Sequence, residues 1–241
     1  MDFKDLEELK EKLKEIKEKG FIKTHREGNT GIGKTLEDEL NIIENNSPKG
    51  DFNLGDIPVE LKAKRKKSSN RITLYTKEPI WIIDKYEVIS KTAYKDIKGR
   101  TALKIILNTN KFNDKGFKLE LTDNRIYLIH KLLGKVGYFD IDKIIKIMRE
   151  KLGNNLLLVF ANVQKKDEIE YFNYIEAIYF SRFKDDSFER MLRENKVIFE
   201  FRLHLNPSGS ARDRGSGFRV GKKFLKELYE KEEIILSAKQ K

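Results

Sequence analysis

Residues 51–67, with the sequence DFNLGDIPVELKAKRKK, combine an acidic turn, a predicted strand and a basic run. Because successive side chains of a strand point to opposite faces, Glu60 and Lys62 share one face and Leu61 points into the core. Carboxylates bind Mg²⁺ and leave its other positions to water and substrate oxygens, and the Leu61 carbonyl can add a ligand. A lysine beside them can orient or deprotonate the attacking water. The stretch therefore predicts a metal-dependent site for phosphodiester hydrolysis.

Two aspartates compete to complete this metal site with Glu60. Asp56 has the same strand parity as Glu60, although Gly55 and Pro58 disturb the local backbone. Asp51 lies further back, on the turn or on a preceding strand. Parity alone slightly favours Asp56, and the aspartate that does not bind metal is interpreted as an ordinary turn residue.

The composition favours a polyanionic partner. The 241 residues include 50 Lys and Arg against 39 Asp and Glu, which gives a net charge of +11. Such an excess binds nucleic acid through counterion release, although a heat-adapted surface explains it equally well. The absence of cysteine excludes disulfides and cysteine-based zinc sites. With no apolar run of membrane-spanning length and a highly charged N-terminus, the chain is interpreted as cytoplasmic with no membrane partner.

Hydrophobic periodicity predicts an α+β fold dominated by antiparallel hairpins. Helices are expected over residues 2–19, 36–45 (with Thr35 as the N-cap), 140–152, 185–195 and 221–231. Strands are expected over residues 57–66, 71–76, 80–89, 102–108, 116–122, 125–131, 155–163, 172–181 and 197–205. Loops are expected over residues 20–34, 47–56 and 206–217, and Ser68 and Ser69 are expected to turn a hairpin between the first two strands. Two lobes around a cleft fit this order of elements.

Two basic segments carry groups that suit DNA. Residues 64–67 and Arg71 follow the acidic site directly, and they are expected along a DNA backbone unless they form a solvated hairpin tip. Residues 202–223, RLHLNPSGSARDRGSGFRVGKK, lead from a strand into a loop rich in Gly and Arg. Arginine can bind guanine there, and Asp213 can orient an arginine or accept from cytosine. The alternative for this second segment is a flexible surface loop.

Residues 28–35, GNTGIGKT, match the spacing of a phosphate-binding P-loop. The preceding residues, FIKTHRE, make a poor buried strand, and no alternation of strands and helices follows. Nucleotide hydrolysis is therefore the weaker hypothesis for this chain.

The order of three short motifs resembles the active-site layout of the MutH-like nucleases, which belong to the PD-(D/E)XK superfamily. These motifs are Thr35-Leu36-Glu37 on a helix, Asp51-Phe52 in the next turn and Glu60-Leu61-Lys62 on a strand. The loop THREGNTGIGKTLE, the segment ITLYTKEP at residues 72–79 and RDRGSGFR at residues 212–219 are similar to pieces of the MvaI/BcnI restriction endonucleases. The resemblance extends from about Gly20 to the final helix.

The resemblance implies a type II restriction endonuclease that cuts double-stranded DNA with Mg²⁺, for which Mn²⁺ substitutes. It implies the catalytic residues Glu37, Asp51, Glu60 and Lys62, with Asp51, Glu60 and Leu61 as metal ligands, and it favours Asp51 over Asp56. The residues expected to bind DNA are His25, Arg26, Lys34, Lys64, Arg65, Lys77, His204, Arg212, Asp213, Arg214, Arg219 and Lys222.

The resemblance also implies one nuclease chain, residues 1–241, with a PD-(D/E)XK core, a mixed and largely antiparallel sheet, and a recognition lobe. The catalytic lobe is expected within roughly residues 1–100 plus parts of the middle, and the recognition lobe mainly within roughly residues 101–241. A monomer, a short pseudopalindromic site flanked by CC/GG, and a cognate methyltransferase as functional partner are expected. The alternatives are a MutH-like nicking repair endonuclease and a DNA-binding module without catalysis.

Overall fold

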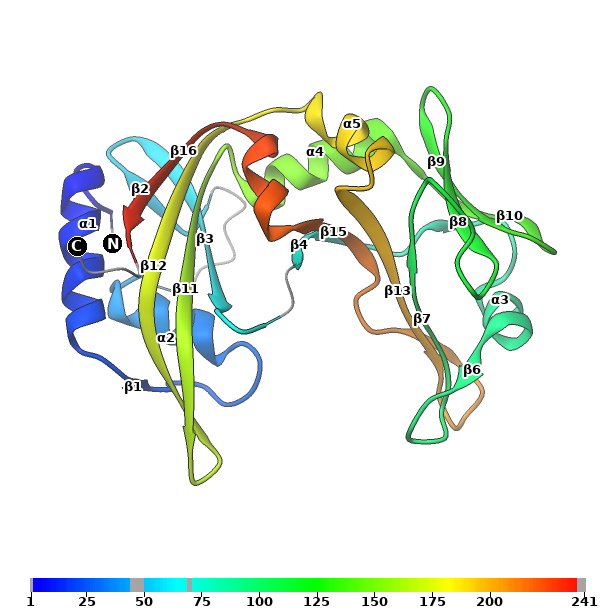
Figure 1. The fold of residues 1–241 in the computed structure, drawn as a ribbon, viewed down its shortest axis with the longest axis horizontal. Coiled ribbons are helices and arrows are strands. Elements are labelled where there is room, and N and C mark those ends of the chain that lie inside the picture. Colours follow the sequence, from blue (N-terminus) through cyan, green and yellow to red (C-terminus); the bar gives the residue numbers. More distant parts are fainter. Residues whose placement is uncertain (1, 44–49, 69–70, 238–241) are drawn as a thin grey trace. The chain divides into compact units, whose positions relative to one another are not determined.

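The computed structural model describes residues 2–43, 50–68 and 71–237, which form two compact units (Figure 1). Unit 1 spans residues 1–69, 149–184 and 229–241, and unit 2 spans residues 70–148 and 185–228. The chain thus passes repeatedly from one unit to the other. This division differs from the expected boundary near residue 100, because the second unit is inserted into the first. None of the described helices is long and apolar enough to span a membrane.

A mixed sheet forms the centre of unit 1, with the strand order β1-β12-β11-β3-β2 and β16 also paired to β12. β3 runs parallel to β11, with Glu60 opposite Leu156, whereas the other strand pairs are antiparallel. The sheet is therefore mixed and largely antiparallel, as expected. Its strands are β1 (Ile22–Lys23), β2 (Phe52–Leu54), β3 (Ile57–Arg65), β11 (Asn155–Lys166), β12 (Ile169–Phe183) and β16 (Tyr229–Leu236).

Two helices pack against this sheet, α1 (Leu6–Glu18) and α2 (Gly31–Glu39). The N-cap of α1 is Asp5, whose carboxylate accepts from the Glu8 backbone N–H at 3.0 Å. The apolar side chains of α1 recur at helical spacing and are fully buried, so each contributes about 1.5–3 kcal/mol of transfer free energy. They are Leu9, Leu13 and Ile16. On β12, the Tyr174 hydroxyl donates to the Ile32 carbonyl of α2 at 2.7 Å and ties that helix to the sheet.

Two antiparallel sheets form unit 2, in the orders β4-β15-β13-β7-β6, with β14 beside β13, and β5-β10-β9-β8. Their strands are β4 (Arg71–Thr76), β5 (Ile80–Trp81), β6 (Tyr94–Lys95), β7 (Thr101–Leu107), β8 (Phe117–Leu121), β9 (Arg125–His130), β10 (Gly134–Asp140), β13 (Val197–Leu205), β14 (Ala211–Asp213) and β15 (Gly217–Gly221). The helices are α3 (Lys85–Thr92), α5 (Ser187–Arg193) and the 3₁₀ helix η1 (Lys222–Leu228). α4 (Ile141–Leu152) begins in unit 2 and ends in unit 1. Phe199 makes edge contacts with Phe201 and Phe218 at 5.1 Å in the core of this unit.

The expectation for the start of the second helix is wrong, because α2 begins at Gly31 rather than after Thr35. Thr35 is buried inside the helix, where its hydroxyl accepts from the His25 backbone N–H at 3.0 Å. A β-carbon on Gly31 would lie 2.2 Å from the Arg26 carbonyl oxygen. Only glycine permits this approach, so the preceding loop folds tightly over the first turn. The expected last residues of this helix, 44 and 45, lie outside the described residues.

Several other expected elements differ from the structure. The expected strand 80–89 is β5 followed by α3, whose N-cap Asp84 accepts from the Tyr86 and Glu87 backbone N–H groups. The expected final helix, 221–231, is η1 followed by β16, and the expected loops contain β2 and β14. The expected hairpin between residues 57–66 and 71–76 does not form, since β3 pairs with β11 and β4 with β15. Ser69 of its expected turn lies outside the described residues.

Candidate active site

Strand β3 places the two central side chains of the candidate site together. The Lys62 ammonium lies 2.7 Å from a carboxylate oxygen of Glu60, and both side chains are about one quarter exposed. It also donates to the Lys151 carbonyl at 3.3 Å, near the end of α4. Leu61 packs against the core of unit 1, so the alternation expected from the sequence is present. The ammonium group is therefore held beside the carboxylate by two contacts.

The structure distinguishes the two candidate aspartates. Asp51 lies beside β3, where its carboxylate accepts from the Leu61 backbone N–H at 2.6 Å and its own N–H donates to the Val59 carbonyl at 2.9 Å. Asp56 is exposed in the turn of the β2–β3 hairpin. Only Asp51 is therefore next to the Glu60–Lys62 pair, and the slight preference of strand parity for Asp56 is not supported.

Burial and the neighbouring positive charges act on the carboxyl group of Glu60 in opposite directions. Burial raises its pKa above the ordinary value, and the nearby charge of Asp51 raises it further, while Lys62 and Lys151 oppose the shift. Two neighbouring carboxylates in a partly buried place favour binding of a positive charge.

Glu37 lies on the other face of β3. It lines a cavity of about 370 Å³ whose other polar lining residues are Arg26, Asn29, Thr30, Lys34 and Asp51. Ala63 also lines this cavity, and Ala63 alternates with Lys62 along the strand. Asp51, at the edge of β3, thus lies next to Glu60 and Lys62 and also lines the cavity on the opposite face of the strand. Glu37 shares the cavity with Asp51, whereas Glu60 and Lys62 do not line it.

The donor set fits a hard divalent cation. Asp51, Glu60 and the Leu61 carbonyl could supply oxygen ligands of the type that Mg²⁺ prefers. Within residues 2–43, 50–68 and 71–237, no three His, Cys, Asp or Glu side chains gather closely enough to hold a metal by themselves. A cation at this place would therefore be held by two carboxylates and a backbone carbonyl.

The residue pattern and the fold agree with one group of known proteins. A model described as the MvaI/BcnI restriction endonuclease family matches residues 10–229. The chain belongs to this family. The enzyme is therefore a type II site-specific deoxyribonuclease.

Solved structures show the same fold. The enzyme resembles "Restriction endonuclease MvaI-cognate DNA substrate complex" with a TM-score of 0.74 and 24% identity, over 96% of this chain and 98% of that chain. The TM-score to "Restriction endonuclease MvaI in the absence of DNA" is 0.52 at 21% identity, over 95% of this chain and 96% of that chain. No curated protein sequence matches the chain.

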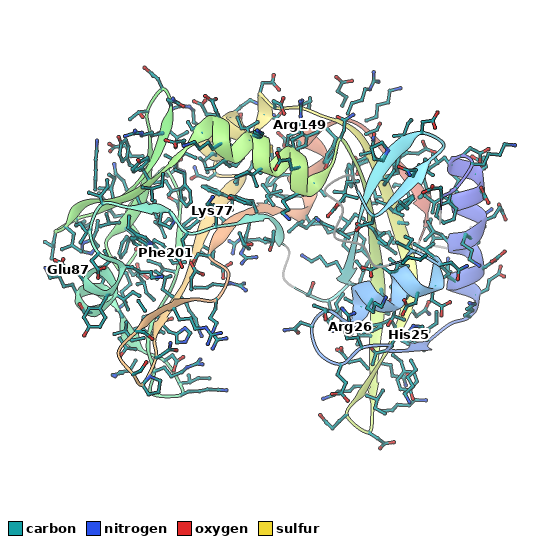
Figure 2. All side chains as sticks on the ribbon, turned by 180° about the vertical axis from the view of Figure 1, so that it is seen from behind. His25, Arg26, Lys77, Glu87, Arg149 and Phe201 are labelled. Atoms are coloured by element: carbon teal, nitrogen blue, oxygen red, sulfur yellow. The ribbon has the colours of Figure 1, made fainter. Side chains whose placement is uncertain are left out.

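The DNA-binding candidates of unit 1 differ in their surroundings. His25 and Arg26 lie on the segment before α2 (Figure 2), where the His25 ring contacts Asp38 at 2.9 Å. Lys34 pairs with the same Asp38 at 2.8 Å. Lys64 is partly buried on the same face of β3 as Lys62. Arg65 is bound internally to Glu170, so its position does not support the expected DNA contact.

The candidates of unit 2 come together at β13, β14 and β15. The Lys77 backbone N–H donates to the Ser216 carbonyl at 3.0 Å, which joins the 72–79 segment to the 212–219 segment. Asp213 accepts from the Gly215 and Ser216 backbone N–H groups, so it shapes the loop. The exposed candidates are Lys77, Arg212 and Arg214, and Lys222 is the first residue of η1.

Arg219 does not suit the expected DNA contact. Its side chain is only 9% exposed, and it forms an ion pair with Glu200 and contacts the Thr73 hydroxyl. Burial lowers the pKa of its guanidinium. Arg219 therefore holds β15 to β13 and β4.

A basic cavity of about 430 Å³ contains cations that the sequence did not single out. Its lining residues are Arg100, Lys104, Glu200, Arg202, His204 and Arg214. Burial and the adjacent Arg214 and Arg100 lower the pKa of His204, which favours the neutral form of its ring. Lys104 and Arg202 are opposite each other in the β7–β13 pair. Only this strand register, which the sequence does not specify, could have revealed the cluster.

Gly153 lies close to Glu60. Gly153 has a φ of 68°, and a β-carbon there would lie 2.9 Å from the Asn155 carbonyl and 3.3 Å from the Glu60 β-carbon. Gly20 has a similar φ of 72° with nothing within 4 Å. Since alanine in the left-handed region costs about 1–2 kcal/mol, Gly20→Ala should lower Tm by several degrees.

Gly153→Ala should lower Tm more than Gly20→Ala, because the added methyl group also displaces Glu60. It should also reduce the cleavage rate, which Gly20→Ala should leave intact. Melting curves and cleavage rates of the two variants check this. Equal Tm values with equal rates would show that the space beside Glu60 is not restricted.

The raised pKa of Glu60 predicts a stability effect of Glu60→Gln. A carboxyl whose pKa is raised by folding stabilises the protein as pH falls through that pKa, and it costs stability when ionised at higher pH. Without metal, the variant should therefore have a higher Tm than the wild type at pH 8, with a difference that shrinks towards acidic pH. It should not cleave DNA. A lower Tm at every pH would mean that the ion pair with Lys62 outweighs the burial of the carboxylate.

Proposed function

We propose that the enzyme hydrolyses phosphodiester bonds of double-stranded DNA with one or more Mg²⁺ ions, and that Mn²⁺ substitutes for Mg²⁺. The observation that carries this proposal is the placement of Asp51 beside the Glu60–Lys62 pair, within a chain of the MvaI/BcnI family. Asp51, Glu60 and the Leu61 carbonyl are the proposed ligands. When bound, the cation supplies charge neutralisation at the phosphate and lowers the pKa of a bound water.

Lys62 is the proposed group that orients the attacking water and stabilises negative charge on the phosphate. Its ammonium is already fixed by Glu60 and the Lys151 carbonyl, so little reorganisation is needed during the reaction. Glu37 lies on the Asp51 side, where we propose that it orients groups in the cavity that it shares with Asp51 and Lys34. On these assignments, unit 1 is the proposed catalytic lobe and contains the proposed PD-(D/E)XK core.

Unit 2 is the proposed recognition lobe. Its basic cavity combines arginines, which bind guanine edges in a bidentate manner, with a neutral histidine that can donate or accept. Similarity to the solved complex of MvaI with its cognate DNA supports DNA as the partner. A short pseudopalindromic site flanked by CC/GG is the proposed target. The enzyme is proposed to act as a monomer that cuts the two strands successively, opposed in its host by a methyltransferase.

Supercoiled plasmid incubated with the purified enzyme tests this proposal. With Mg²⁺ or Mn²⁺ we expect a nicked intermediate followed by discrete linear fragments, and with EDTA no cleavage. Sequencing the fragment ends would give the recognition site. Nicks without fragments would favour a MutH-like nicking enzyme, and metal-independent binding without cleavage would favour a non-catalytic module. Family membership gives no support to the P-loop hypothesis.

A further inference from the structure

Arg65 joins three segments of unit 1 that are distant in the sequence. Its guanidinium forms a two-point ion pair with Glu170 of β12, with atom separations of 3.2 and 2.5 Å. It also donates to the Gly28 carbonyl at 3.4 Å and to the Asn29 carbonyl at 3.3 Å. The guanidinium carbon lies 5.6 Å from the ring centre of Phe172, in cation–π range. Arg65 is thus bound on several sides by the protein itself.

The contacted carbonyls belong to the loop that enters α2. Gly31 begins this helix directly after the loop and packs against the Arg26 carbonyl and the Thr24 hydroxyl. The Thr24 hydroxyl in turn donates to the Arg26 carbonyl at 2.7 Å. The loop therefore has little freedom to move once residues 28 and 29 are held.

The same loop and helix line the cavity beside Asp51. Asn29 and Thr30 come from the loop, and Lys34 and Glu37 come from α2. Tyr174 holds the middle of the first turn through the Ile32 carbonyl. Arg65 holds the residues before it, so the two contacts together fix where α2 begins relative to β3.

We propose that Arg65 is a positioning residue, which with Glu170 fixes the loop over the Asp51 cavity and does not itself contact DNA. A fixed guanidinium fork suits this role, because it satisfies a carboxylate and two carbonyls at once. Lysine could not replace all of these contacts. The kinetic part of this inference rests on the proposed nuclease function, whereas the structural part does not.

The carboxylate of Glu170 distinguishes a positioning role of Arg65 from a DNA contact. Only 25% of the Arg65 side chain and 26% of the Glu170 side chain are exposed, and the pair is neutral as a unit. A phosphate approaching Arg65 would have to compete with Glu170 at the same donors. A phosphate contact and a loop contact therefore predict opposite effects of removing the Glu170 charge.

Arg65→Gln, Glu170→Gln and the double variant test the proposal, with Lys67→Gln as the reference for loss of one exposed positive charge. We expect both single variants to lower kcat by about 10- to 100-fold, and the double variant to lose no more than the worse single. The dependence of DNA affinity on salt should stay unchanged in the Arg65 variant. Removing a phosphate contact should instead reduce the salt slope by about one.

Amide hydrogen exchange gives a readout that needs no cleavage. Exchange at residues 28–33 should accelerate in both single variants at temperatures well below Tm, while exchange in α1 stays as in the wild type. Arg65→Lys should recover the charge but not the slow exchange. Unchanged exchange together with a reduced salt slope in Arg65→Gln, and normal cleavage by Glu170→Gln, would overturn the proposal in favour of a DNA contact.

Discussion

Replacing Lys62 by Met is expected to lower the rate of DNA cleavage by at least about 10²–10³-fold, the usual cost of one preorganised charge donor at a reacting centre. The ammonium is held at 2.7 Å from Glu60 and 3.3 Å from the Lys151 carbonyl, beside the proposed metal ligands. Met keeps the volume of the side chain and removes its charge and donors. Single-turnover cleavage with saturating enzyme measures the chemical step alone.

Lys64→Met is the matched control, because Lys64 lies two residues further along the same face of β3. Lys64 is expected to contact the DNA backbone. Lys64→Met should therefore weaken DNA binding and reduce the salt dependence of DNA affinity, while its single-turnover rate stays near that of the wild type. DNA binding in Ca²⁺ should remain near normal in Lys62→Met. Equal single-turnover cleavage rates for Lys62→Met and Lys64→Met would show that Lys62 is not a catalytic residue.

Asp51→Asn is expected to abolish metal-dependent cleavage, whereas Asp56→Asn should cleave at nearly the wild-type rate. Asp51 accepts from the Leu61 N–H at 2.6 Å, next to the Glu60–Lys62 pair, and its nearby charge adds to the burial that raises the pKa of Glu60. Asp56 is exposed in the hairpin turn. Cleavage rates across a Mn²⁺ concentration series measure both the activity and the apparent metal affinity.

The pair of aspartate variants also tests the assignment of the ligands. Partial recovery of Asp51→Asn at high Mn²⁺ concentration would support a ligand role, because Mn²⁺ binds the same oxygen ligands more strongly than Mg²⁺. The opposite pattern, an inactive Asp56→Asn with an active Asp51→Asn, would indicate that Asp56 in the hairpin turn is the metal ligand.

The Glu60–Lys62 geometry could be predicted because it depends on local rules. Residues two apart on a strand share a face, and β3 keeps this alternation through an unbroken register with β11. The choice between Asp51 and Asp56 depended on where β2 begins, which the alternation of β3 cannot specify. The resemblance to a family favoured Asp51, and in the structure Asp51 is the aspartate that lies beside β3, next to Glu60.

The surroundings of the cations could not be predicted. Arg65 and Arg219 lie in basic segments, and in sequence they are indistinguishable from DNA contacts. Their carboxylate partners, Glu170 and Glu200, lie on other strands, and the Arg65 partner is 105 residues away. The start of α2 was misplaced for a similar reason. Its first turn is set by the close packing of Gly31 under the loop rather than by the capping preference of Thr35.

A crystal of the enzyme with uncleaved DNA and Mn²⁺, measured at an X-ray energy that reveals the anomalous signal of manganese, tests the metal site most directly. We expect a manganese peak bonded to carboxylate oxygens of Asp51 and Glu60 and to the Leu61 carbonyl, with a phosphate oxygen and the Lys62 ammonium beside it. A peak bonded to neither Asp51 nor Glu60 would contradict this account of the active site.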